Sequence, residues 1–467
     1  MTELRLYDTL RRGVEPFRPR VPGIATVYSC GPTVYSRQHL GNMRPYVFAD
    51  LLTRVLRLQG YEVNHVINIT DVGHLTDDAD QGDDKLERAA RSAGTRVMEV
   101  ARVWTELFQR DLALLGVSPP NVWAKASEHI DDQIAMIREL EAKGFTYPLA
   151  DGIYFDTARD PNYGALSRLR ASAEHARVDA TGKRQPADFA LWKFSPSSGS
   201  RRQLEWLSPW GVGFPGWHIE CSAMATRYLG REIDIHTGGV DHVAVHHTNE
   251  IAQSESALGV RPWVRFWMHG AWLNLDGEKI SKSRAHERKP PSLDDLGELG
   301  TTPAGFRYYL YTAHYRSALN LSSDALRSAE SARRRLAALA RAADAVPSDA
   351  PPKSESLRKL RRRFFDALYD DLNAPRALSA IWEIADEPEP LAERARLVKE
   401  LAQTLGLDLS DAVHSGPDDA WIEQLVEQRE RARRAGNYAL SDALRADLAA
   451  RGVVVEDRAS GSRWRRA

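Results

Sequence analysis

Two cysteines and a histidine–glutamate pair carry the side chains that bind transition metals. Cys30 and Cys221 are the only cysteines among 467 residues, and His246 and Glu250 are spaced four apart. That spacing places His246 and Glu250 on one face of a helix. Two thiolates, one imidazole and one carboxylate make a plausible tetrahedral zinc set if the fold brings them together. The four residues are scattered along the sequence, so spacing alone does not establish the set.

The same region contains competing histidines. His247 lies three residues from Glu250, and His236 and His242 are further candidates. The ordinary alternative is that these histidines are hydrogen-bonded core residues and that each cysteine is a small buried hydrophobe. Two cysteines in so long a chain argue against a disulfide framework.

A second group of residues is suited to phosphate binding. A buried strand pattern, Ile24–Tyr28, is followed by Gly31 in a turn, and a helix is expected to start at His39–Asn42. A glycine-containing turn before a helix brings backbone N–H groups and the positive end of the helix dipole near a phosphate. The stretch Ser29–Asn42 therefore combines a thiol with a phosphate-binding turn.

Two lysines farther along the chain offer positive charge. Gly277–Ser283 places Lys279 and Lys282 among two serines, where the ammonium groups could hold a polyphosphate as point charges. A solvated basic loop is the usual alternative for such a stretch. Together with the His39–Asn42 turn, these lysines predict a site that stabilises charge on a phosphoryl group by position.

The elements that must position these residues predict an α/β fold. Strand patterns at Tyr61–Ile67 and Ile233–His236 end in polar or glycine residues, Asn68–Asp71 and Gly238–Gly239. Ligands of an open α/β sheet bind at this carboxyl edge. Helices are expected at 97–108, 130–140 and 243–258, and another strand at Trp267–Leu275.

Changes in composition and in hydrophobic pattern along the chain indicate several domains. Residues 145–215 contain short strand patterns with recurring Gly, Pro and Ser, which indicates an insertion that splits the nucleotide-binding fold. After Pro290–Pro291 the pattern is mostly helical. A Pro- and Ser-containing linker lies near 345–356, and a break at Ser415–Pro417 precedes helices and a strand at Val453–Val455.

Composition narrows the class of protein. The net charge is −1, so any nucleic-acid contact requires local patches. No run of eighteen apolar residues and no apolar N-terminal signal core is present, so we expect a cytoplasmic protein without membrane contact. One basic patch includes Trp464, although interleaved Asp and Glu also fit a solvated helix face. Its arginines are Arg429, Arg431, Arg433, Arg434, Arg445, Arg451, Arg458, Arg463, Arg465 and Arg466.

The motifs together resemble the cysteinyl-tRNA synthetases, which are class I aminoacyl-tRNA synthetases. The two class signatures stand here as His39–Asn42 and Lys279–Ser283. Motifs more specific to the family are CGPTVY at 30–35, NITD at 68–71, GWHIECSAM at 216–224, DIHTGG at 234–239 and HHTNEIAQS at 246–254. The similarity continues through FRYYLYTAHYRSALN at 306–320 and DDLNAPRALSAI at 370–381 to GSRWRR near the C-terminus, so it spans nearly the whole chain.

The resemblance implies an architecture. A Rossmann-like class I synthetase catalytic domain with a parallel sheet is expected at 1–300, with a connective insertion at about 115–215. A helical stem-contact region is expected at 301–350 and a helical-bundle anticodon-binding domain at 351–412. A small C-terminal tRNA-binding domain of mixed structure is expected at 413–467.

The resemblance also assigns site residues. One zinc ion per chain would be bound by Cys30, Cys221, His246 and Glu250. The cysteine pocket would be lined by Cys30, Thr70, Trp217 and His236. The expected catalytic residues are His39, Asn42, Lys279 and Lys282. The residues expected to contact ATP, with Mg²⁺, are Gly31, His39, Gly41, Asn42, Gly238, Gly239, Asp241 and Lys282.

The implied reaction has two steps and the partners ATP, L-cysteine and tRNA(Cys). ATP and cysteine form cysteinyl-adenylate and pyrophosphate, and the terminal ribose hydroxyl of tRNA(Cys) then attacks the acyl carbon. Zinc would bind the substrate thiolate, which a serine hydroxyl matches poorly. A metal anchor can reject an analogue by about 10⁴–10⁵, so no editing domain is needed. The resemblance suggests a monomer.

The sequence departs from the family pattern at two places. About ten extra residues within Val72–Gly82 precede Asp83, and they form either a surface loop or a segment that contacts the tRNA acceptor end or gates the pocket. Arg284–His286 stands where the family commonly has Leu-Gly-Asn.

Two other functions are alternatives. A ligase joining cysteine to an amino sugar in mycothiol synthesis should lack a full anticodon-binding C-terminus. A non-catalytic tRNA-binding paralogue should have lost His39, Lys282 or a zinc ligand.

Overall fold

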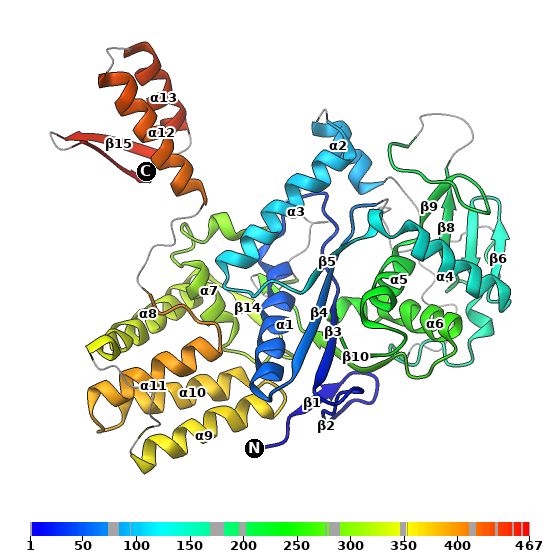
Figure 1. Ribbon diagram of the computed structural model, residues 1–467, viewed down its shortest axis with the longest axis horizontal. Coiled ribbons are helices and arrows are strands. Elements are labelled where there is room, and N and C mark those ends of the chain that lie inside the picture. The colour runs from blue at the N-terminus through cyan, green and yellow to red at the C-terminus, as the bar shows by residue number, and fades with distance from the viewer. Residues whose placement is uncertain are drawn as a thin grey trace. The chain divides into compact units, whose positions relative to one another are not determined.

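The computed structural model separates the chain into two compact units, Met1–Leu409 and Ser410–Ala467 (Figure 1). The residues that it describes are 2–72, 84–93, 95–168, 182–195, 202–275, 278–279, 290–345, 352, 354–410, 417–434, 438–450, 453–458 and 461–466. No helix in these ranges is both long and apolar enough to cross a bilayer.

A five-stranded parallel sheet forms the centre of the first unit. Its strand order is β11-β10-β3-β4-β5, and every neighbouring pair is parallel. The chain runs outward from β3 through β4 to β5 and later places β10 and β11 on the other side of β3. The strand order therefore reverses between β3 and β10, where an α/β sheet opens a ligand crevice. The strands are β3 (Ile24–Ser29), β4 (Glu62–Ile69), β5 (Val122–Lys125), β10 (Ile233–Gly239) and β11 (Val264–Gly270).

Successive apolar side chains of β3 and β4 point to opposite faces of the sheet and contribute to a hydrophobic core on each face. Val27 and Ile67 belong to the core that contains α1 (Leu40–Leu58), whereas Tyr28 and Val66 belong to the core that contains α5 (Trp217–Leu229) and α6 (His246–Leu258). Successive side chains of a strand point to opposite faces, so both faces of these strands are buried. Figure 1 shows α1 on one side of the sheet and α5 and α6 on the other. The α/β fold class expected from the sequence is confirmed.

Residues 115–215 do not form one uniform insertion. β5 lies in this range but pairs in parallel with Val66–Ile69, so it is the edge strand of the central sheet. The separate antiparallel sheet begins after α4 (Ile130–Ala142) and has the order β6-β7-β8-β9. Its strands are β6 (Thr146–Leu149), β7 (Gly152–Phe155), β8 (Phe189–Phe194) and β9 (Gly213–Pro215).

The single strand expected at Trp267–Leu275 is instead two strands. β11 ends at Gly270, and β12 (Leu273–Leu275) leaves the central sheet to pair with β13 (Glu278–Lys279) and β14 (Leu319–Leu321). The change of partners at Gly270 ends the first strand. The small sheet β13-β12-β14 thus begins directly beside the carboxyl end of the central sheet.

The helical part of the first unit shares a core with α1. Buried Arg307 donates from Nη1 to the carbonyl of Leu115 (2.9 Å) and from Nη2 to the carbonyl of Leu405 (2.8 Å), and it pairs with Asp50 of α1. The helices are α7 (Pro303–Leu310), α8 (Ser323–Ala340), α9 (Glu355–Tyr369), α10 (Ala374–Asp386) and α11 (Leu391–Thr404). The other elements are β1 (Arg5–Asp8), β2 (Gly13–Pro16), α2 (Lys85–Ala93) and α3 (Val97–Leu114).

The second unit has a hydrophobic core of its own. It consists of α12 (Pro417–Arg434), α13 (Tyr438–Ala450) and a hairpin of β15 (Val453–Arg458) and β16 (Gly461–Arg466). Its core contains Ile422, Val426, Leu448, Val453 and Val455. A separate core is what allows this unit to fold independently of the first.

Candidate active site and metal centre

A cavity of about 340 Å³ opens at the point where the strand order reverses. Its walls come from the carboxyl ends of β3, β10 and β11, the start of α1, and α5. Segments far apart in sequence therefore meet here, as the parallel sheet topology requires. Ten of the expected site residues line this cavity: Cys30, Gly31, His39, Gly41, Asn42, Trp217, Cys221, Gly239, Asp241 and His246.

Other expected site residues are described but lie behind this lining. Thr70 donates from Oγ1 to Glu220 Oε2 (3.1 Å), and fully buried His236 bonds through Nε2 to Glu250 Oε2 (2.8 Å). A Cβ built on Gly238 would lie 2.7 Å from the ring of His247, so this glycine permits close packing at the end of β10. These contacts support the wall of the cavity.

The start of α1 is built by His39 and Asn42. The backbone N–H of Asn42 donates to His39 Nδ1 (3.3 Å), and the backbone N–H of His39 donates to Asn42 Oδ1 (3.2 Å). These two reciprocal capping bonds hold the imidazole in one orientation. Nδ1 accepts a hydrogen bond, and a ring nitrogen that accepts carries no proton. In the neutral ring the proton is therefore on Nε2, which makes that atom a donor beside the cavity.

The lysine–serine segment is anchored on both sides. Lys279 is placed only by its backbone, which pairs with Asn274 across β12 and β13. After the segment, the carbonyl of Pro291 accepts from the N–H of Leu40 at the start of α1 (2.8 Å). Lys282 and Arg284–His286 lie outside the described residues, as does the expected insertion after Val72. The described residues before the segment thus belong to the small sheet, and those after it contact the start of α1.

Four buried side chains from three elements form a candidate metal centre. Cys30 follows β3, Cys221 lies on α5, and His246 and Glu250 lie one turn apart on α6. The ligand atoms of all four lie within 4.8 Å of one another. His246 Nε2 is 2.7 Å from Glu250 Oε1. Two sulfurs, one imidazole nitrogen and one carboxylate oxygen match the donors that zinc takes in proteins.

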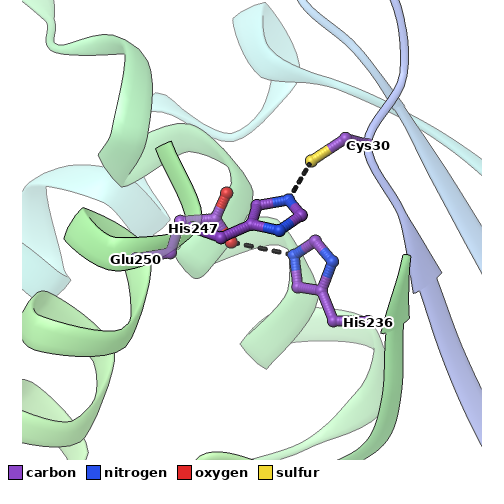
Figure 2. Close-up of side chains that lie close together, drawn as sticks. All are labelled: Cys30, His236, His247 and Glu250. Carbon is purple, nitrogen blue, oxygen red and sulfur yellow. Dashed lines mark hydrogen bonds and ion pairs between the residues drawn. The ribbon is translucent and has the colours of Figure 1, made fainter. Parts of the chain in front are cut away.

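A second set of ligands overlaps the first. It consists of Cys30, His236, His247 and Glu250, whose ligand atoms also lie within 4.8 Å of one another. Figure 2 shows His247 Nε2 facing Cys30 Sγ (3.2 Å) and His236 facing Glu250. In this second set only Cys30 lines the cavity, whereas Cys30, Cys221 and His246 of the first set all do. A metal in the first set is therefore the one that a ligand in the cavity can reach.

The charges of the cluster suit a divalent cation. A hydrogen bond from the Cys30 thiol lowers the pKa of Cys221 to about 6 against the effect of burial, and burial raises the pKa of Cys30 well above its usual range. Burial opposes ionisation of Glu250, but His246 and His236 hold the pKa of this carboxyl well below its usual range. One thiolate and one carboxylate are thus favoured, and metal ligation needs such deprotonated donors.

Lys85 and Trp272 are among the cavity residues that were not singled out in the sequence. Lys85, the first residue of α2, lines the cavity, and so does Trp272, which is 43% exposed. Neither residue has a spacing signal in the sequence. The closest sequence signal for Lys85 was its place directly after the acidic pair Asp83–Asp84.

Replacing Gly31 with alanine should destabilise the fold strongly. A Cβ at this position would lie 1.6 Å from the backbone oxygen of Asn68, so the cavity wall must move. We expect a loss of roughly 3 kcal/mol or more in the free energy of unfolding, the upper range for overpacking. Gly13→Ala is the matched control, because its Cβ meets nothing within 4 Å. Equal urea denaturation midpoints for the two variants would contradict the close approach.

Comparisons with known proteins give consistent matches. Residues 16–331 match the catalytic domain of class I (C) tRNA synthetases, and residues 419–465 match the cysteinyl-tRNA ligase anticodon binding domain. Cysteine–tRNA ligase 1 of Burkholderia lata is 45% identical over 464 residues, covering 98% of this chain and 96% of that protein. Cysteine–tRNA ligase of Thermus thermophilus is 40% identical, covering 99% of each.

A solved structure shares the fold at low sequence identity. Methionyl-tRNA synthetase of Mycobacterium tuberculosis, solved with methionyl-adenylate, has a TM-score of 0.57 and 18% identity. The match covers 81% of this chain and 88% of that one. Identity this low supports the fold only.

Proposed function

The chain belongs to the cysteinyl-tRNA synthetase family, and we propose that it activates L-cysteine with ATP and transfers the cysteinyl group to the 3′ end of tRNA(Cys). It is thus a ligase whose family implies ATP, an amino acid and tRNA as partners. The observation that carries the proposal is one cavity bounded by the capped start of α1 and by Cys30, Cys221 and His246. Adenylation needs these two ends, one for a phosphate and one for the side chain of the amino acid.

We propose zinc as the resident metal, one ion per chain, held by Cys30, Cys221, His246 and Glu250. The donor set fits it, since two of the four ligands are soft sulfur atoms. When bound, zinc supplies a Lewis acid that favours the thiolate form of substrate cysteine. The protein's own part is to hold the ligands rigidly between β3, α5 and α6. The Trp217 ring stacks on His246 with centroids 4.2 Å apart, which restricts the orientation of that imidazole.

The ATP end of the cavity is proposed at the start of α1. Unsatisfied N–H groups and the helix dipole favour phosphate at a helix N-terminus. His39 Nε2–H would donate to a phosphate oxygen, and Lys279 and Lys282 would add positive charge. Gly31, Gly41, Gly239 and Asp241 are proposed to contact the nucleotide with its Mg²⁺. No covalent intermediate with the protein is needed, because position and charge lower the barrier.

The remaining parts are proposed to contact tRNA. Residues 301–350 would contact the stem, 351–412 would bind near the anticodon, and 413–467 would extend that interface. The exposed arginines of the second unit are partly neutralised, since Arg431 pairs with Glu427 (2.6 Å) and Arg434 with Glu430 (3.0 Å). We propose that the protein acts as a monomer.

Two assays test the proposed function. Purified protein should catalyse cysteine-dependent ATP–pyrophosphate exchange and should charge tRNA(Cys) with cysteine. Exchange without charging, but with ligation of cysteine to glucosaminyl-inositol, would replace the proposal with the mycothiol-pathway ligase. Absence of exchange would indicate a non-catalytic tRNA-binding paralogue.

Removing residues 410–467 should separate the two steps. The second unit has its own core, so the remaining 1–409 unit should fold and retain cysteine-dependent pyrophosphate exchange. Charging of tRNA(Cys) should fall through a raised KM for tRNA, because the removed residues include 419–465, which match the anticodon binding domain. Steady-state kinetics of both reactions on the same preparation check this. Unchanged charging would contradict a role for this unit in tRNA binding.

A further inference from the structure

Arg44 is a buried guanidinium that has no carboxylate partner within the described ranges. It lies in the second turn of α1 and is 3% exposed. Burial lowers its pKa to about 10, with Tyr309 opposing the shift, so it stays charged at neutral pH. Burying a charge without an opposite charge is costly unless hydrogen bonds replace the lost water.

Four backbone carbonyls provide those hydrogen bonds. Nη1 donates to Ala271 (3.0 Å) and Trp272 (2.6 Å), and Nη2 donates to His314 (3.2 Å) and Ser317 (2.6 Å). The planar fork of a guanidinium holds several acceptors at fixed spacing, which the single ammonium of a lysine does not. Arg44 thus fixes two separate backbone segments to one helix.

These segments lead directly into the small sheet that carries Lys279. Ala271 and Trp272 precede β12, and Ser317 precedes β14, which pairs with β12 from Leu273 and Leu319 onward. On its other side β12 pairs with β13, which places Lys279 opposite Asn274. The position of this sheet relative to α1 is therefore set at Arg44.

The start of α1 and the segment before β12, which Arg44 joins, both form walls of the cavity. His39, Asn42 and Pro45 of the α1 start line it, and so do Ala271 and Trp272. The walls approach closely, since a Cβ on Gly270 would lie 3.9 Å from Pro45 Cα. A shift at the guanidinium would alter the distance between the His39–Asn42 motif and the strand of Lys279.

We propose that Arg44 is a positioning residue for adenylate formation, which sets the spacing of the two phosphate-binding motifs by clamping the β13-β12-β14 sheet to the start of α1. This inference rests on the proposed function, because it takes those motifs to bind ATP. The cysteine end of the cavity is held by other elements, β3, α5 and α6. Arg44 should therefore govern the rate of adenylation and leave cysteine binding and metal content unaffected.

The test compares R44K and R44Q with the wild-type full-length protein. R44K keeps the charge and R44Q removes the cost of burying a charge, and neither side chain can donate to all four carbonyls. In cysteine-dependent pyrophosphate exchange we expect kcat to fall by about 10²-fold, the effect of a small misplacement of reacting groups. The KM for cysteine and the bound metal should not change.

R307K is the matched control for a purely structural effect. Arg307 is also buried and bonds backbone carbonyls, and it pairs with Asp50 in the middle of α1, but neither residue lines the cavity. It should lower Tm as R44K does while leaving the kcat of exchange unchanged. The proposal is overturned if the kcat of both Arg44 variants equals that of the wild type, or if R307K and R44K lose kcat equally. Absence of exchange in the wild type would instead reject the proposed function.

Discussion

Cys221→Ser should remove the metal and cysteine activation together. Cys221 is one of two sulfur donors in the cavity-lining set, and a serine hydroxyl is a poor ligand for zinc. We expect bound zinc to fall well below one ion per chain. Because second-shell changes alone cost 10- to 100-fold, cysteine-dependent pyrophosphate exchange should fall by more than about 100-fold. Metal analysis and exchange kinetics on one preparation measure both quantities.

His247→Gln distinguishes the two overlapping ligand sets. His247 belongs only to the set with His236, and Cys221 belongs only to the set with His246. If the metal lies in the cavity-lining set, the His247 variant keeps its zinc and the Cys221 variant loses it. The reverse pattern would place the metal in the set of Figure 2, of which only Cys30 lines the cavity. Normal zinc and normal activity in Cys221→Ser would reject its assignment as a ligand.

His39→Asn should slow adenylate formation while the fold remains intact. Asparagine is a good N-cap residue, so the start of α1 keeps its capping bond but loses the imidazole donor. Loss of one charge-stabilising donor costs about 10²–10³ in kcat in comparable sites. We expect that decrease in the kcat of pyrophosphate exchange, with Tm and zinc content unchanged. Differential scanning calorimetry and exchange kinetics check the two expectations.

His39→Ala and Ser322→Ala complete this comparison. His39→Ala removes both cap and imidazole, so it should lose activity and also about 1 kcal/mol of stability. Ser322 caps α8 by accepting from the N–H of Ala325 (3.2 Å) and does not line the cavity. Its alanine variant should lose similar stability without loss of exchange. Wild-type exchange in His39→Asn would show that capping is the whole role of His39.

The sequence was sufficient for the class of fold and for naming many of the residues that line the cavity. Residues near the ends of strands carry a local signal, because a parallel sheet presents its carboxyl ends at one edge. This is why Cys30, Gly31 and His39–Asn42 could be placed at one site before any coordinates. The pair His246 and Glu250 was also accessible, since helical periodicity fixes which residues share a face.

Strand membership was harder to predict where the signal is not local. Val122–Lys125 has the pattern of a short strand, but its partner Val66–Ile69 lies more than fifty positions earlier in the numbering. The stretch Trp267–Leu275 reads as one strand, yet a change of partners at Gly270 divides it. Pairing depends on which edges are available, and only the assembled sheets determine that.

What the sequence determined by itself is the inventory of donors and the elements that carry them. The tertiary structure decided which donors meet. It placed Cys221 and His246 on the cavity wall and put Thr70, His236 and Glu250 behind it. It also surrounded Arg44 with four backbone carbonyls, which no sequence motif predicts. The physical reason is that a metal centre or a buried charge depends on distances among elements remote in sequence, and packing of the cores sets those distances.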